Sequence, residues 1–207
     1  MADGFTPVQI VDLSEQVLHN WLQRIQPVIY KSPNRLDRKW PWSRMYRYLP
    51  LVERSRGRNM AGYAVQVQNA HGDAVPAGLV LLSLGYPALD DQQEQSVFLW
   101  YLTDAPIEAL QDLKVSVKPR LLETLVDIAL VVSEAQGYSG KIGLHAADEA
   151  GNPAAQRLLE SYQTRCGLLS LPPDAKIPSL VRFNDGRYFY TTPLVAQKLM
   201  AALDYLR

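Results

Sequence analysis

Asp104 and His145 are the two side chains of the central part of the chain whose positions could carry acid–base chemistry. Asp104 follows the apolar run 97–102, so we expect it at a strand end, where clefts form in α/β sheets. There it could act as a base, or it could form the turn before Ala105 and Pro106. His145 falls within the short run 141–146. This setting predicts a histidine satisfied inside a buried strand, and a catalytic imidazole is the alternative.

The other reactive groups indicate structural roles. The chain has one cysteine, Cys166, so no internal disulfide can form, which fits a reducing compartment. It stands beside Gly167 and Leu168 in an apolar stretch, which predicts a small buried side chain rather than a nucleophile. The loop 87–95 carries three carboxylates that we expect to be solvated. The histidines are scattered, no zinc-ligand spacing occurs, and neither a G-x-S-x-G nor a Walker sequence is present.

Basic and aromatic side chains gather between residues 35 and 58. The basic ones are Arg35, Arg38, Lys39, Arg44, Arg47, Arg54, Arg56 and Arg58. They predict a solvated helix face, and a docking surface for an acidic ligand is the alternative. The aromatic ones are Trp40, Trp42, Tyr46 and Tyr48. We expect these rings to pack against a sheet, or else to line a substrate site.

Helical periodicity opens the chain and strand patterns follow. Apolar residues recur at helical spacing from Val17 to Ile25, with Asp12 expected as the cap and Pro27 near the end. A second helical stretch is expected over 40–56, where Pro50 would interrupt or kink it. A meander of three strands is then predicted at 64–68, 78–84 and 97–102.

The second half of the chain predicts a crossover connection. Loop character extends to Lys118, and Pro119 suits the first position of a broadly apolar helix that ends at the glycines of 137–140. Asn152 is expected to cap a later helix that reaches about Arg165. Two strands, at 141–146 and 187–191, and a helix over 194–205 complete the pattern. This order predicts an α/β fold with a mixed central sheet and helices on both faces.

Length and composition are those of one globular domain. The 207 residues are 47 % hydrophobic and 20 % charged, which predicts a single domain over 1–207 with a substantial core. The formal net charge of zero gives no global attraction to nucleic acid or anionic lipid. No apolar run reaches the roughly 18 residues of a membrane span, and no signal peptide is evident. We therefore expect a cytoplasmic protein that binds neither nucleic acid nor membrane.

Three segments in the second half of the chain are informative because of their order and spacing. They are 98–106 (FLWYLTDAP), 137–146 (GYSGKIGLHA), and 162–168 (YQTRCGL) followed by Tyr188 and Phe189. Together they resemble the fourth strand, the entry to the fifth strand and the ending of the GCN5-related N-acetyltransferase (GNAT) family. The upstream stretch 37–42 (DRKWPW) is similar to an aromatic stretch of the same branch. The resemblance spans 97–192 and implies a GNAT-like fold.

The resemblance implies transfer of an acetyl group from acetyl-coenzyme A to an amine by direct attack. In such a fold two neighbouring strands diverge and the pantetheine arm lies in the gap. Backbone groups of Leu102 and Thr103 would then bind that arm, and an N–H there would polarise the thioester carbonyl. The resemblance also places Asn152 beside the cofactor and implies that Tyr162 protonates the leaving thiolate. A half-buried structural tyrosine is the alternative for Tyr162.

The expected phosphate-binding loop departs from the family's Q/R-x-x-G-x-G/A pattern, in which glycines bring backbone N–H groups close to the pyrophosphate. The matching residues 113–120 read LKVSVKPR, which puts Ser116 and Lys118 at the glycine positions and a proline at 119. The residues that would bind the cofactor here are Val115, Ser116, Val117, Lys118 and Arg120. They form either a modified cradle or a loop that has lost the cofactor, and basic residues at a surface helix start are the plainer alternative.

Two functions fit these patterns. The first is an acyl-coenzyme A-dependent N-acyltransferase that modifies an amine of a small molecule or a protein. In it, the helical region 1–58 would form the acceptor side and 60–207 the sheet and cofactor side. The second is a non-catalytic module on the same scaffold that has lost coenzyme A binding. It would bind a partner protein or a second copy of itself.

Overall fold

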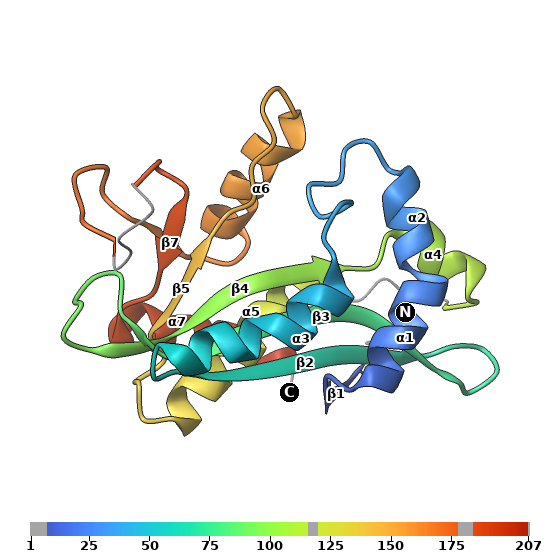
Figure 1. The fold of residues 1–207 in the computed structure, drawn as a ribbon, viewed down its shortest axis with the longest axis horizontal. Coiled ribbons are helices and arrows are strands. Elements are labelled where there is room, and N and C mark those ends of the chain that lie inside the picture. Colours follow the sequence, from blue (N-terminus) through green and yellow to red (C-terminus); the bar gives the residue numbers. More distant parts are fainter. Residues whose placement is uncertain (1–7, 116–119, 178–183, 207) are drawn as a thin grey trace.

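The computed structural model describes residues 8–115, 120–177 and 184–206 (Figure 1). Within them the strands form a seven-stranded sheet in the order β1-β2-β3-β4-β5-β7-β6. An antiparallel meander comprises β1 (Val8–Asp12), β2 (Asn59–Gln68), β3 (Ala74–Pro87) and β4 (Gln95–Asp104). β4 is parallel to β5 (Ile142–His145), while β7 (Tyr188–Tyr190) is antiparallel to β5 and to β6 (Leu169–Ser170). The predicted mixed α/β sheet is confirmed.

Helices cover both faces of this sheet. Figure 1 shows α3 (Trp42–Ser55) in front of it and α5 (Leu121–Ala135) behind it. Two glycines mark the faces: a Cβ on Gly62 would lie 3.1 Å from Leu13, just before α1 (Glu15–Arg24), and one on Gly78 would lie 3.1 Å from Leu125 of α5. The remaining helices are α2 (Gln26–Lys31), α4 (Ile107–Asp112), α6 (Pro153–Thr164), α7 (Pro193–Ala202) and the 3-10 turn η1 (Asp204–Leu206). Over the described ranges, no helix is long and apolar enough to cross a membrane.

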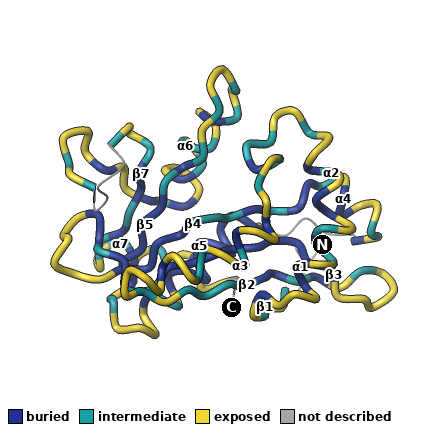
Figure 2. Tube along the Cα trace, in the orientation of Figure 1, coloured by how far each residue is buried: buried dark blue, intermediate teal, exposed yellow. Residues whose placement is uncertain are grey.

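The core forms around β3, β4 and α5, which are the most continuously buried elements in Figure 2. β3 lies between β2 and β4 and is buried from Val75 to Ser83, as its uninterrupted apolar run predicts. α5 is buried over most of its length because its apolar surface is broad. Gly137, with a φ of 79°, follows its C-terminal end, where a residue without a Cβ adopts the left-handed conformation at little cost.

Residues 1–58 had been expected to form a helical region, but the described part of it also contains a strand. Val8–Asp12 is the edge strand β1, so Asp12 does not cap α1. The side chain of Ser14 does so instead, accepting a hydrogen bond from the Val17 N–H at 3.3 Å. Pro50 lies inside α3, which continues past it to Ser55. α4 occupies part of the segment before Lys118 where loop was expected, and Leu194, at the start of the expected helix 194–205, is 62 % exposed.

A buried carboxylate connects α3 to the sheet. Glu53 has no exposed surface and accepts hydrogen bonds from Arg56 at 3.1 Å, from Arg58 at 3.3 Å and from the Ser83 hydroxyl at 2.6 Å. The guanidinium of Arg58 also lies 4.3 Å from the centre of the Tyr86 ring. The expectation of a solvated helix face is therefore wrong for Arg58, which closes this network over the sheet.

Replacing Glu53 with glutamine should lower the free energy of unfolding by about 1–3 kcal/mol. The amide keeps the shape and one hydrogen bond, but it removes the negative charge that Arg56 and Arg58 share. Urea denaturation measures the change. The exposed pair of Glu15 and Arg47, whose atoms are 3.5 Å apart, provides the control, because Glu15→Gln should cost less than about 1 kcal/mol. Equal losses in the two variants would contradict the role of Glu53.

Candidate active site

The sheet opens between β4 and β5. These strands pair over three positions, Val97 with Ile142, Phe98 with Gly143 and Leu99 with Leu144. β5 ends one residue later at His145, whereas β4 continues to Asp104. Within the described residues, the edge of β4 beyond Leu99 therefore has no neighbouring strand on the β5 side. This is the divergence that the resemblance predicted.

A β-bulge marks the start of this opening. On the other edge of β4, Leu82 of β3 pairs with Leu99 and Leu81 pairs with Tyr101, so Trp100 is an extra residue. A bulge of this kind bends a strand and increases its local twist. The bend turns the end of β4 away from β5 at the point where their pairing stops.

Strand geometry decides which backbone groups face the opening. The Ala105 N–H donates to the Ala77 carbonyl of β3 at 2.7 Å, and hydrogen-bonded pairs alternate along an antiparallel ladder. Thr103 therefore bonds toward β3, while the N–H and carbonyl of Leu102 face the opening. The expectation that both residues offer backbone groups to a ligand is thus revised. The side-chain hydroxyl of the buried Thr103 instead donates to Asp37.

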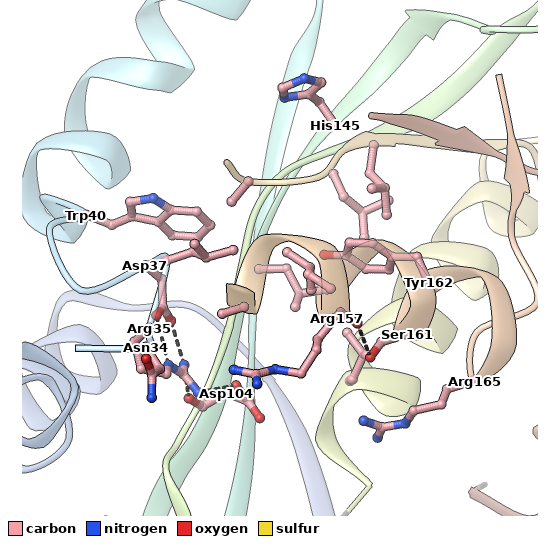
Figure 3. A pocket seen from close by; sticks show the side chains of 18 of the residues that line it. Asn34, Arg35, Asp37, Trp40, Asp104, His145, Arg157, Ser161, Tyr162 and Arg165 are labelled. Carbon is pink, nitrogen blue, oxygen red and sulfur yellow. Dashed lines mark hydrogen bonds and ion pairs between the residues drawn. The ribbon is translucent and has the colours of Figure 1, made fainter. Parts of the chain in front are cut away.

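A cavity of about 250 Å³ lies at the opening, and Figure 3 shows its lining. Its walls come from β4, β5, α6, the loop before α3 and the first turn of α5. The lining side chains with polar or aromatic character are Asn34, Arg35, Asp37, Trp40, Trp100, Asp104, His145, Arg157, Ser161, Tyr162 and Arg165. Apolar side chains, including Leu99, Leu102 and Leu144, cover the rest. An apolar site with a few polar groups is typical of small-molecule binding.

Tyr162 supplies a hydroxyl to this cavity. Tyr162 is 5 % exposed, and the centre of its ring lies 5.5 Å from that of the Phe189 ring. The hydroxyl has no hydrogen-bond partner among the residues that the structure describes. Burial raises the pKa of this phenol well above its ordinary value, and the nearby Cys166, Asp104 and Asp37 act in the same direction. Tyr162 is therefore protonated at neutral pH and free to donate.

His145 lies at the end of β5 rather than inside a fully buried strand, so the expectation of a core histidine is corrected. Its side chain is 22 % exposed and lines the cavity. The Nε2 atom is 2.9 Å from Asp185 Oδ2, and the ring packs at 4.5 Å from the Tyr188 ring. Although burial opposes it, the hydrogen bond from His145 lowers the pKa of Asp185. Both side chains are partly exposed, His145 to 22 % and Asp185 to 47 %.

Asp104 lines the cavity as expected, but it is bonded to a cation. The guanidinium of Arg35 donates to Asp104 Oδ1 at 2.8 Å and to Asp37 at 2.9 and 2.6 Å. It also donates to the Asp104 carbonyl at 2.7 Å. Burial opposes the charge of Arg35, yet the hydrogen bonds and charges of Asp37 and Asp104 raise its pKa. Both carboxylates of the lining are therefore hydrogen-bonded to this one cation.

The described part of the expected phosphate loop offers few free groups. The Val115 N–H donates to the Leu110 carbonyl at 2.9 Å, and the Val115 side chain is buried, so this residue cannot bind a phosphate. Arg120 donates to the Tyr205 hydroxyl at 2.8 Å and does not line the cavity. Ser116, Val117, Lys118 and the expected helix start at Pro119 lie outside the described residues.

The side chain of Asn152, which was expected beside the cofactor, forms hydrogen bonds at the start of α6. Its side-chain oxygen accepts from the Ala154 N–H at 3.0 Å, which caps α6 as predicted, and its amide donates to Glu149 at 2.8 Å. It does not line the cavity. Glu149 in turn accepts from Arg38 at 2.6 Å and so joins the loop before α3 to the loop before α6. Asn152 therefore positions the helix that carries Tyr162.

Three further expectations can be compared with the structure. Cys166 is buried as predicted, and burial raises the pKa of its thiol to about 12, which makes it unreactive. Asp90 is not simply solvated, because with Glu94 it bonds to the buried Lys141. Trp42 is core, as favoured, whereas Trp40 lines the cavity and packs at 5.0 Å from the Tyr101 ring.

Solved structures with the same fold are acetyltransferases. No family model and no curated protein matches the sequence. An acetyltransferase of the GNAT family from Staphylococcus aureus gives a TM-score of 0.51 at 14 % identity, with 88 % of this chain and 97 % of that chain covered. A second solved structure, assigned as an acetyltransferase, gives a TM-score of 0.52 at 16 % identity, with 98 % of this chain and 94 % of that chain covered. A spermidine N-acetyltransferase from Vibrio cholerae, in complex with CoA and spermine, gives 0.48 at 18 % identity, with 92 % and 98 % covered. The first two structures, with TM-scores of 0.51 and 0.52, show that the chain has the GNAT fold.

Proposed function

We propose that the protein is an acetyl-coenzyme A-dependent N-acetyltransferase that acts on an amine of a small molecule or a protein. The observation that carries the proposal is the cavity at the divergence of β4 and β5, with the protonated Tyr162 hydroxyl free inside it. A thioester needs a site that excludes bulk water and supplies a proton to the leaving thiolate. Tyr162 provides the proton, and Leu102 provides an N–H at the open edge for the thioester carbonyl or the arm behind it.

The cavity suggests how the two substrates are divided. Tyr162 and Leu122 come from α6 and α5 behind the sheet, whereas Trp40 and Asp37 come from the loop before α3. In our proposal the thioester enters from the side of α5 and α6, and the amine enters beside Trp40. Residues 1–58 would then form most of the acceptor side, and 60–207 the sheet and the cofactor side.

The chain fits one part of coenzyme A better than the other. The cavity between the strands suits an acyl-pantetheine group, because its lining is mainly apolar and the β4 edge has unpaired backbone groups. The Val115 N–H is already bonded to Leu110, so it offers no contact to the diphosphate, whereas Arg120 keeps further N–H donors beside its bond to Tyr205. Binding of the diphosphate would therefore depend on residues 116–118 and on Arg120, and is a separate question from binding of the thioester.

Acetyl-coenzyme A should bind with a dissociation constant in the micromolar to millimolar range, and Ser161→Trp should abolish this binding. Ser161 lines the cavity beside Tyr162, so an indole at this position fills the space without entering the core. Isothermal titration calorimetry measures both affinities. Glu160→Trp is the matched control, because residue 160 precedes Ser161 in α6 but is exposed outside the cavity. No binding to the wild type, or equal binding to both variants, would defeat the cofactor proposal.

A non-catalytic module is the second candidate, and the bonded Val115 N–H favours it. Titration of S-acetylpantetheine beside acetyl-coenzyme A separates the two candidates. A functioning cradle makes the full coenzyme bind at least about tenfold more tightly, since charged hydrogen bonds to the phosphates contribute about 1.5–3 kcal/mol each. If neither compound binds and the protein instead purifies with a stoichiometric partner or as a homodimer, the module is the better description.

A further inference from the structure

We infer that His145 accepts the proton of the attacking amine and that Asp185 holds its ring in place, an inference that rests on the proposed transferase function. The two residues are 2.9 Å apart at the carboxyl end of β5. This is where the paired part of β4 and β5 ends and the cavity begins.

His145 and Tyr162 act from opposite faces of the sheet. His145 of β5 pairs with Tyr188 of β7 and packs on its ring. Tyr188 belongs to the same hydrophobic cluster as Phe98. Phe98 faces α3, because it pairs with Ser83, whose hydroxyl bonds to Glu53 of that helix. Tyr162 of α6 packs on Phe189, which pairs with Leu144 and therefore faces the side of the sheet opposite to His145. Figure 3 likewise shows the His145 ring apart from the Tyr162 ring, with the β5 backbone between them.

This arrangement matches the needs of a direct attack. The amine must add to the carbonyl carbon and lose a proton, and the thiolate that leaves the tetrahedral intermediate must gain one. A proton acceptor on the α3 face and a proton donor on the α6 face serve these two positions. Trp40 also lies on the α3 face, so His145 and the expected amine entrance share one side of the sheet.

The carboxylates of the cavity are poorly suited to this role. Asp37 and Asp104 both accept hydrogen bonds from Arg35, and Asp37 also accepts from Thr103. The lone pairs that accept these hydrogen bonds are not available to the amine. Among the residues that line the described cavity, His145 is the base that is not committed to a cation.

The partners of His145 determine which nitrogen reacts. Asp185 is a carboxylate, so Nε2 carries the hydrogen and donates to it, which leaves Nδ1 as the acceptor. Nδ1 has no hydrogen-bond partner among the residues that are described. The other charged groups nearby are Arg187, which donates to the Ala146 and Ala147 carbonyls, and Asp148, which is 3.7 Å from Arg187. Neither of them is bonded to the imidazole.

The proton and electron balance of the step is complete with these two residues. The amine nitrogen forms a bond to the carbonyl carbon, and the C–S bond breaks with its electron pair on sulfur. His145 Nδ1 takes the proton that nitrogen loses, and the Tyr162 hydroxyl gives a proton to the thiolate. The products are the amide and free coenzyme A, and solvent returns the proton from His145 to Tyr162.

The test is the pH dependence of kcat/KM with acetyl-coenzyme A and O-methylhydroxylamine, which is uncharged at neutral pH and so adds no titration of its own there. The wild type should show a rate that rises with pH, because an imidazole must be unprotonated to accept the proton of the amine. His145→Gln should lack this limb and be about ten- to a hundredfold slower at its plateau. Asp185→Asn should keep the limb and lose about three- to tenfold at the plateau, as expected for a positioning residue. His71→Gln, at an exposed histidine in the β2–β3 turn, is the control and should change neither.

Each outcome has a distinct meaning. A His145→Gln variant that keeps the limb, or that matches the wild-type plateau, overturns the assignment of His145 while leaving the transferase proposal intact. A wild-type protein that binds acetyl-coenzyme A in calorimetry but consumes none with any amine tested overturns the transferase proposal. Loss of the limb in His145→Gln, with circular dichroism and acetyl-coenzyme A affinity unchanged, supports the inference.

Discussion

Replacing Tyr162 with phenylalanine should lower kcat by about ten- to a thousandfold while changing acetyl-coenzyme A affinity by less than about threefold. The substitution removes one oxygen and leaves the ring in its contact with Phe189. Because the hydroxyl has no hydrogen-bond partner among the described residues, its loss should not disturb the fold. The change therefore isolates proton donation to the thiolate.

Release of coenzyme A, followed with a thiol reagent, measures this effect. Because burial raises the pKa of Tyr162, the phenol stays protonated through neutral and mildly alkaline pH, and it should produce no falling limb below about pH 10. Tyr30→Phe serves as the control, since Tyr30 is 58 % exposed on α2. A kcat equal to that of the control would remove Tyr162 from the role of general acid.

Replacing Arg35 with methionine should lower the free energy of unfolding by about 3–5 kcal/mol. The arginine forms ion pairs with Asp37, whose side chain is 9 % exposed, and with Asp104. Methionine fills a similar length but leaves a buried carboxylate without its cation. The loop before α3 would then lose its attachment to the end of β4.

Urea denaturation measures this loss, with Arg47→Met as the matched control. Arg47 and Glu15 are 67 % and 73 % exposed, so that substitution should cost less than about 1 kcal/mol. The double variant Arg35→Met with Asp37→Asn should recover part of the stability, because it removes the unpaired charge. No difference between Arg35→Met and the control would show that Arg35 does not hold the loop.

The fold could largely be predicted because its main elements have strong local signals. The apolar run of β3, the broad apolar surface of α5 and the Asn152-Pro153 start of α6 depend on neighbouring residues alone. β1 was missed since its five residues gain their strand conformation by pairing with β2, which is more than 50 residues away. Short elements of this kind are determined by tertiary contacts rather than by propensity.

The site was harder to predict, for the same physical reason. The family resemblance indicated Tyr162, the strand-end position indicated Asp104, and both side chains line the cavity. No local pattern, however, indicates that Arg35 bonds to Asp104, 69 residues later. The partner of His145 likewise comes from a turn 40 residues away. Thr103 was placed on the correct strand but with its backbone toward the wrong edge, because the alternation depends on the register with β3.

The extra residue at position 100 has a further consequence for how this strand tolerates change. Since the bulge shifts the alternation of β4 by one place, Phe98 and Tyr101 both face α3 although three positions separate them. The opening between β4 and β5 thus depends on the number of residues in β4 rather than on the identity of one side chain. A substitution of Trp100 leaves that length intact, whereas removal of a single residue would realign the strand and exchange its two surfaces.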